Sequence, residues 1–276
     1  MLKRILIGLD GSKYASSATE AGIQLAKTYN ASLVGMAVID LPGIERHLGS
    51  APAGAIHFAE KEKEYKLQDA IQKAQKFLQE FGQKCKAAKV RYQLFSTSGV
   101  PFKEIIEQSK VTDLTIVGLR TFYHFETQDE EHDTLKKLLD QSASPILAVP
   151  ETIQPYENVL LTYDGSVQAA RAIRMRILIT KKMSAKYTLL TVSDDPNHNQ
   201  VLLGNMAEYL KSHGIMAETI SLTGDHAEAI LETAKKLQPV QVVMGAYSRS
   251  SVAEFFFGST ADALVKDGTI PLFVYH

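Results

Sequence analysis

The feature that most constrains the fold is an internal repeat that spans nearly the whole chain. Residues 4–12 read Arg-Ile-Leu-Ile-Gly-Leu-Asp-Gly-Ser, and residues 158–166 read Asn-Val-Leu-Leu-Thr-Tyr-Asp-Gly-Ser. Each is a short apolar run that ends in Asp-Gly-Ser, and apolar residues at helical spacing follow over 16–29 and 168–181. A continuous apolar run of this length predicts a strand buried on both faces. Each repeat therefore opens with a strand, a turn and a helix.

Later segments match in the same order. Gly99 stands six residues before Ile105, as Gly224 stands six residues before Ile230. Further apolar runs predict strands in matching positions: 31–39 with 187–193, 113–118 with 240–245, and 144–149 with 270–275. Because several pairs keep their order over nearly the whole chain, we interpret the sequence as a duplication of one folding unit.

Alternating strands and helices favour a parallel sheet with right-handed crossovers and helices on both faces. We therefore predict an α/β fold of two tandem doubly wound domains, each with an open, mainly parallel five-stranded sheet. The expected domains are residues 1–150 and 156–276, since 150–157 is a polar stretch with two prolines and no periodicity. The first repeat is longer because of residues 41–59, whose glycines, prolines and alanines suggest a flexible surface loop, and a charged helix is expected over 60–88.

The composition disfavours several classes of partner. A net charge of -1, from 30 basic and 31 acidic residues, gives no basic surface for nucleic acid or for an anionic membrane. The single cysteine, Cys85, forms neither an internal disulfide nor a cysteine cluster for a metal. The apolar run Ile5 to Leu9 is too short for a signal peptide or a membrane span, so we expect a cytoplasmic protein.

Candidate ligand residues follow the strands of the second repeat. Ligands of open parallel sheets bind beyond the carboxyl ends of the strands. Asp164, Val192 and Gly245 come at the ends of the first, second and fourth predicted strands of this repeat. We expect Asp164 to accept hydrogen bonds from sugar hydroxyls, and Gly245 to leave room for a ribose or a phosphate. The alternative is that Gly245 serves only a tight turn.

A helix begins near Gly258 and offers a site for an anion. Apolar residues at helical spacing follow Gly258, so its free N–H groups and the positive end of the helix dipole meet at 258–260. Gly258 has no Cβ to obstruct an oxygen, Ser259 and Thr260 add hydroxyl donors, and Arg249 adds positive charge. The alternative is that Ser259 only caps a helix. Together with the strand ends, these residues predict a site for a phosphate chain.

The spacing of this segment resembles that of the universal stress proteins, whose ATP-binding members carry Gly, two residues, Gly, nine residues, and Gly followed by Ser or Thr. This chain has Gly245, then Ser248 after two residues, and Gly258-Ser259 after nine more. The resemblance extends to both repeats through the Asp-Gly-Ser that follows each first strand. One departure is Ser248, which stands in place of the second glycine, where its Cβ would crowd the phosphates and its hydroxyl could donate to them.

The resemblance implies a tandem universal stress protein, a stress-response regulator that binds ATP, with or without Mg²⁺, in its C-terminal domain only. It also implies that the last strands of the two repeats, 146–149 and 272–275, pair as an intrachain pseudo-dimer. A homodimer is left open, and the protein partner is unknown. The residues implied to border the adenine and ribose, the nucleoside and the phosphates are Thr162, Tyr163, Asp164, Val192, Met244, Gly245, Tyr247, Ser248, Arg249, Gly258, Ser259 and Thr260.

The first repeat lacks the corresponding cradle. Counting back from Pro145 and Pro271 aligns Thr134 with Thr260, so His132-Asp133 stands in place of Gly258-Ser259. The preceding acids, Asp129 to Glu131, add to a negative charge that repels a triphosphate. We expect no ATP in this repeat, while another ligand at Asp10 and Gly118 stays open.

The sequence shows no evident catalytic machinery. It contains no Gly-x-Ser-x-Gly nucleophile elbow and no Gly-x-x-x-x-Gly-Lys-Ser/Thr P-loop. His124 and His132 match no metal-ligand spacing. The alternatives to an ATP-binding regulator are a scaffold that binds no nucleotide and an enzyme that slowly hydrolyses ATP or transfers a group from it.

Overall fold

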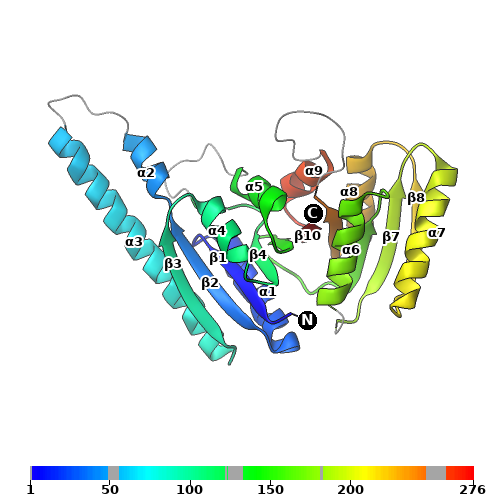
Figure 1. The fold of residues 1–276 in the computed structure, drawn as a ribbon, viewed down its shortest axis with the longest axis horizontal. Helices are drawn as coiled ribbons and strands as arrows, with labels where there is room; N and C mark the ends of the chain where they lie inside the picture. The colour runs from blue at the N-terminus through cyan, green and yellow to red at the C-terminus, as the bar shows by residue number, and fades with distance from the viewer. Residues whose placement is uncertain (1, 49–55, 122, 124–132, 181–182, 247–258) are drawn as a thin grey trace. The chain divides into compact units, whose positions relative to one another are not determined.

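The computed structural model describes residues 2–48, 56–121, 123, 133–180, 183–246 and 259–276. They divide into two compact units, Leu2–Ser144, here called the first unit, and Pro145–His276, the second unit. Both alternate strands and helices along the chain, as the apolar runs predict (Figure 1).

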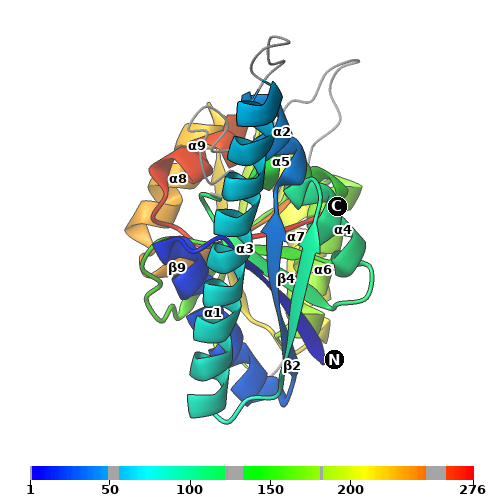
Figure 2. The ribbon, with the colours of Figure 1, turned by 90° about the vertical axis from the view of Figure 1, so that its left-hand side faces the viewer.

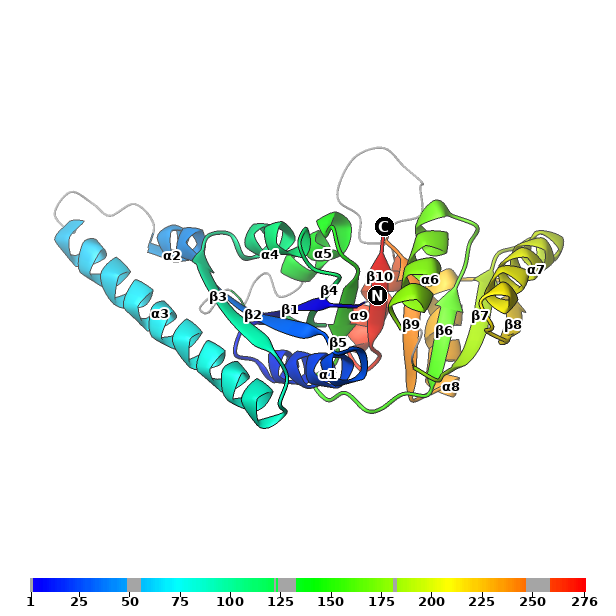
Figure 3. The ribbon, with the colours of Figure 1, turned by 60° about the horizontal axis from the view of Figure 1, so that its bottom comes forward.

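The first unit has four strands in the order β3-β2-β1-β4. All three strand pairs are parallel. Helices α1 and α3 pack on one side of these strands, while α4 and α5 lie together on the other (Figure 3). The elements are β1 (Arg4–Leu9), α1 (Lys13–Tyr29), β2 (Ser32–Ile39), α2 (Leu41–Leu48), α3 (Ile56–Ala87), β3 (Tyr92–Ser98), α4 (Pro101–Ser109), β4 (Leu114–Gly118) and α5 (Asp133–Gln141).

The second unit has six strands in the order β5-β10-β9-β6-β7-β8. The pairs from β10 to β8 are parallel, whereas β5 and β10 pair antiparallel, with Leu147 opposite Phe273. The expected pairing of the last strands is therefore present, and β5, from the first repeat, lies in the second unit. The elements are β5 (Ile146–Val149), β6 (Asn158–Thr162), α6 (Val167–Ile179), β7 (Lys186–Val192), α7 (Pro196–Ser212), β8 (Ala217–Leu222), α8 (His226–Lys236), β9 (Val240–Gly245), α9 (Ser259–Asp267) and β10 (Leu272–Tyr275).

The strand register is the same in both repeats. Leu6 lies opposite Thr115 in the first unit, and Leu160, the residue that aligns with Leu6, lies opposite Val242 in the second. Buried aliphatic side chains fill β1, β2 and β4, and likewise β6, β7 and β9, which is why these strands appear as apolar runs. At these pairs the structure agrees with the alignment of the two repeats.

The expected flexible loop over 41–59 is wrong for its first part, because Leu41–Leu48 forms helix α2. The Asp40 carboxylate accepts the Gly43 N–H at 3.0 Å, and Pro42 occupies the first turn, where it needs no N–H partner. Helix α3 then begins at Ile56, earlier than the predicted residue 60, and runs along β2 (Figure 2). Glycine and proline are both compatible with the first turn of a helix, so their presence here does not by itself indicate a loop.

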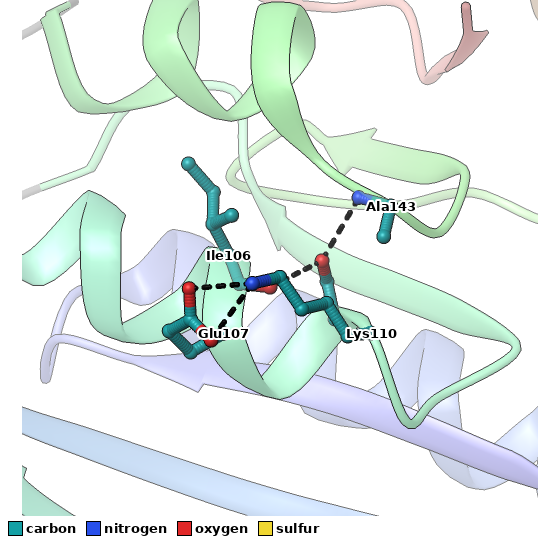
Figure 4. A network of polar contacts seen from close by, with 5 residues as sticks. Ile106, Glu107, Lys110 and Ala143 are labelled. Atoms are coloured by element: carbon teal, nitrogen blue, oxygen red, sulfur yellow. Dashed lines mark hydrogen bonds and ion pairs between the residues drawn. The ribbon is translucent and has the colours of Figure 1, made fainter.

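A small polar network holds α4 against the residues that follow α5. The Ala143 N–H donates to the Ser109 hydroxyl at 3.0 Å, and that hydroxyl donates to the Ile106 carbonyl at 2.7 Å (Figure 4). Beside it, Lys110 and Glu107 form an exposed ion pair at 2.7 Å, which adds little to stability.

Residues 150–157 contain neither helix nor strand, and no helix within the described ranges is long and apolar enough to cross a membrane.

Candidate functional site

The Asp-Gly-Ser of the second repeat forms the turn between β6 and α6. An Asp164 carboxylate oxygen accepts the Ser166 N–H at 2.9 Å, and Gly165 has a φ of +80°, which favours glycine. The Ser166 hydroxyl accepts the Ala169 N–H at 3.1 Å and caps α6. Each of the three residues therefore has a structural task at the end of the strand.

The first repeat builds the same turn. Asp10 accepts the Ser12 N–H at 3.0 Å, Gly11 has a φ of +76°, and the Ser12 hydroxyl accepts the Ala15 N–H at 3.1 Å. Since both repeats use the motif in this way, Asp-Gly-Ser alone indicates no ligand. The two aspartates differ in their surroundings, however: Asp10 is only 6% exposed, whereas Asp164 is exposed.

Hydrogen bonds fix the end of β6 to both neighbouring strands. The Thr162 hydroxyl donates to the Val243 carbonyl at 3.1 Å, and the Tyr163 N–H donates to the Leu190 carbonyl at 2.9 Å. Thr191, which the sequence analysis missed, donates its hydroxyl to the Tyr163 carbonyl at 2.7 Å. Burial and the nearby Asp164 charge raise the pKa of Tyr163, so its phenol is neutral at pH 7. The Thr162 hydroxyl already has a structural acceptor, whereas the Asp164 carboxylate is exposed.

The structure gathers the predicted strand-end residues at one edge of the second unit. Strands β9, β6 and β7 are adjacent and parallel, so their carboxyl ends share an edge. Val192 is buried there, and Met244 and Gly245 are partly exposed. The six residues brought to this edge are Thr162, Tyr163, Asp164, Val192, Met244 and Gly245.

Gly245 has a packing role that the sequence did not predict, and its role beside a ligand stays a prediction. A Cβ at this position would lie 2.5 Å from the Ala169 nitrogen and 2.6 Å from the Gln168 carbonyl carbon. Helix α6 therefore takes the space that the missing side chain leaves. The glycine is required for this approach of helix and strand.

The expected phosphate residues are described only in part. Helix α9 begins at Ser259, as predicted, with the Ser259 side chain exposed and Thr260 half-buried. Tyr247, Ser248, Arg249 and Gly258 lie outside the described residues, as do His124 and residues 129–132 of the first repeat. The described part of this site is thus a helix N-terminus with two hydroxyls.

The first unit contains a cavity of about 210 Å³ between the first turn of α1 and α3. Phe77 and Phe81 line it, and the lining Lys84 donates to the Ser16 hydroxyl at 2.6 Å.

Burial raises the pKa of the Cys85 thiol to about 11, which makes this cysteine a poor nucleophile. Among the described residues, no three His, Cys, Asp or Glu side chains gather in a way that could hold a metal ion.

The C-terminal end of α9 is anchored to α8 by a partly buried ion pair. Lys235 Nζ lies 2.9 Å from Asp267 Oδ2, and the Thr269 hydroxyl also donates to Asp267. Burial alone would raise the pKa of Asp267, but the hydrogen bonds from Thr269 and Lys235 and the Lys235 charge outweigh it, so the pKa lies below 3.8. This contact holds the helix whose other end carries Ser259 and Thr260.

Asp267→Asn is expected to lower the free energy of unfolding of the second unit by at most about 1 kcal/mol at pH 7. Because folding lowers this pKa, the stabilisation is present above the ordinary pKa and is lost as the pH falls through the folded value. Urea unfolding should therefore show a constant difference from the wild type above roughly pH 4 and a shrinking one below it. Glu232→Gln, which breaks the exposed 3.8 Å pair with Lys236, is the control and should have no measurable effect. If the difference in unfolding free energy between Asp267→Asn and the wild type grew towards low pH, the lowered pKa of Asp267 would be wrong.

Comparisons with known proteins agree with this architecture. The model of the universal stress protein family matches residues 1–149 and 198–276. The universal stress protein YxiE of Bacillus subtilis (strain 168) is 25% identical over 145 residues, which cover 43% of this chain and 98% of that protein. One repeat of this chain therefore corresponds in length to a whole relative.

Solved structures of similar length share the fold. A universal stress protein from Archaeoglobus fulgidus DSM 4304 matches with a TM-score of 0.74 and 21% identity, over 99% of this chain and 95% of that one. A putative universal stress protein from Pseudomonas aeruginosa UCBPP-PA14 matches with a TM-score of 0.60 and 14% identity, over 99% and 93%. With the family model covering most of both repeats, the chain belongs to the universal stress protein family.

Proposed function

We propose that this protein is a cytoplasmic stress-response regulator that binds ATP, with or without Mg²⁺, in its second repeat alone. The observation that carries the proposal is the exposed Asp164 carboxylate at the edge where β9, β6 and β7 end, in the same unit as the N-terminus of α9. A carboxylate of this kind accepts hydrogen bonds from ribose hydroxyls. A helix N-terminus with two hydroxyls favours phosphate.

The difference between the repeats supports restricting ATP to the second. Asp10 occupies the position of Asp164 but is 6% exposed, which leaves little of its carboxylate accessible to a ligand. At the start of the corresponding helix, α5, the first repeat has Asp133 where the second has Ser259. A carboxylate at that position repels a phosphate chain.

Ser259→Asp tests the proposal because an acidic residue in the first turn favours the helix while it opposes the phosphates. Isothermal titration of the wild type with ATP should give binding heat, and Ser259→Asp should weaken the affinity by roughly tenfold or more. The matched control is Ser184→Asp, which adds the same charge at an exposed position just before β7, at the amino ends of the strands. It should bind ATP as the wild type does.

Three outcomes would overturn the proposal. Absence of heat with the wild type, with and without Mg²⁺, excludes ATP binding and leaves a scaffold role. Equal affinity in Ser259→Asp and the wild type excludes this helix as the phosphate site. Product formed from ATP by the wild type and abolished in Asp164→Asn would identify an enzyme in place of a regulator.

A further inference from the structure

The side chain of Tyr123 packs against β1 of the first unit at Gly8, where the strand has no side chain. The Tyr123 side chain is 1% exposed. A Cβ at Gly8, the penultimate residue of the strand, would lie only 2.1 Å from the Tyr123 hydroxyl oxygen and 3.4 Å from the ring carbon that carries it. The hydroxyl end of the ring therefore occupies the space above this glycine.

The same ring lies close to the strand-end aspartate. Burial and the Asp10 charge raise the pKa of Tyr123 well above its usual range, so the phenol stays neutral. Asp10 itself is held in place by the N–H and the hydroxyl of Ser12, at 3.0 and 2.6 Å. A neutral ring thus lies close to the carboxylate whose counterpart, Asp164, is exposed in the second unit.

The glycine beneath the ring is specific to the first repeat. The shared Asp-Gly-Ser aligns Gly8 with Thr162, whose side chain is directed to the Val243 carbonyl. Val117 of β4 also faces the space, with a methyl carbon 3.1 Å from a Cβ at Gly8. The strand ends of the first repeat therefore combine a glycine, Gly8, with an apolar side chain, Val117, and a nearby carboxylate, Asp10.

We propose that the strand ends of the first unit form a binding site for a phenolic ring, and that the chain fills this site with its own Tyr123. Removal of the ring should leave a cavity with Gly8 as its floor and Asp10 at its edge. A buried cavity of this kind takes up a small aromatic molecule of matching shape. The site is independent of nucleotide binding in the second unit, and its test involves no ATP.

Tyr123→Ala in the full chain tests the proposal with 4-methylphenol, which has the shape of the tyrosine side chain. The thermal midpoint of the first unit should fall by roughly 5 °C or more, and saturating 4-methylphenol should raise it again by roughly 3 °C or more. The wild type and Tyr123→Phe, in which a ring still fills the space, should show no such rise. A rise of equal size in all three proteins, or no rise in Tyr123→Ala, would overturn the proposal.

A second pair of variants tests the same contact without emptying the site. Gly8→Ala places a methyl group against the Tyr123 hydroxyl and should lower the midpoint, whereas the distance of 3.4 Å to the ring carbon is ordinary contact. Removing the hydroxyl should relieve the 2.1 Å contact and leave the 3.1 Å contact with Val117, so Gly8→Ala with Tyr123→Phe should unfold at a higher temperature than Gly8→Ala alone. Additive effects of the two changes would show that Tyr123 does not occupy this position.

Discussion

Gly245→Ala is expected to cost the second unit about 3 kcal/mol of unfolding free energy, the upper end of the usual range for overpacking. The added methyl group would lie 2.5 Å from the Ala169 nitrogen and 2.6 Å from the Gln168 carbonyl carbon. Both atoms belong to the backbone of the first turn of α6, so no side-chain rotation can relieve the contact. Either α6 moves away from the sheet or β9 shifts, and each change disrupts buried packing.

Urea unfolding of the purified protein measures this cost, and Gly204→Ala is the matched control. Gly204 lies inside α7, and a Cβ there meets nothing within 4 Å. The same substitution should stabilise the second unit by about 0.5–1 kcal/mol, since glycine is unfavourable within a helix. A cost below about 1 kcal/mol at Gly245 would show that α6 does not press on the strand.

The corresponding glycine of the first repeat has a similar task. A Cβ at Gly118 would lie 2.5 Å from the Tyr14 Cβ of α1 and 2.5 Å from the Arg120 carbonyl oxygen. Both repeats thus place a glycine where the helix after the first strand approaches the fourth strand. Substitution of Gly245 changes the fold as well as any ligand site, which is why Ser259→Asp is the sharper test of ATP binding.

The buried strands of each sheet could be predicted from the sequence, and the exposed strands could not. Strands buried on both faces appear as continuous apolar runs, as in β1 and β6. Strands β3 and β8 lie at the ends of their strand orders and expose many of their side chains. Their mixed composition leaves no apolar run from which either strand could be predicted. The intrinsic helix propensity of a short segment is likewise a weak predictor, which is why the sequence favours a loop where helix α2 forms.

The candidate site could be located from the sequence, but the difference between its two copies could not be explained. Parallel strands dictate that Asp10 and Asp164 reach the same position in their repeats. Asp10 is buried near the Tyr123 ring, whereas Asp164 is exposed, and the position of Tyr123 against β1 has no signature in the pattern of apolar residues. The expectation of a first repeat without ATP rests on the acidic residues around 129–133 and stays a prediction.

The other large loss of unfolding free energy is expected at the partner of a buried arginine in the second unit. Arg176 of α6 is fully buried, and its Nε donates to the Gln241 side-chain oxygen at 2.5 Å. Within the described residues, neither terminal nitrogen of its guanidinium has a partner at full hydrogen-bond geometry, although the guanidinium lies close enough to the Tyr156 hydroxyl to oppose the rise that burial causes in the pKa of Tyr156. The Gln241 amide is 1% exposed and also donates to the Tyr156 hydroxyl at 2.8 Å. The guanidinium therefore donates to one amide oxygen, and this hydrogen bond, with the nearby Tyr156 hydroxyl, is its compensation for lost hydration.

Gln241→Leu should lower the unfolding free energy by about 3 kcal/mol, because it leaves a buried charge without its partner. Arg176→Met should stay within about 1 kcal/mol of the wild type, since it removes the charge and keeps the volume of the side chain. The double variant should then be more stable than Gln241→Leu alone by about 2 kcal/mol, which urea unfolding of the four proteins can resolve. The test is which single variant loses more unfolding free energy. A larger loss in Arg176→Met than in Gln241→Leu would show that the guanidinium stabilises the unit. The idea of an undercompensated charge at the amino ends of β6 and β9 would then be wrong.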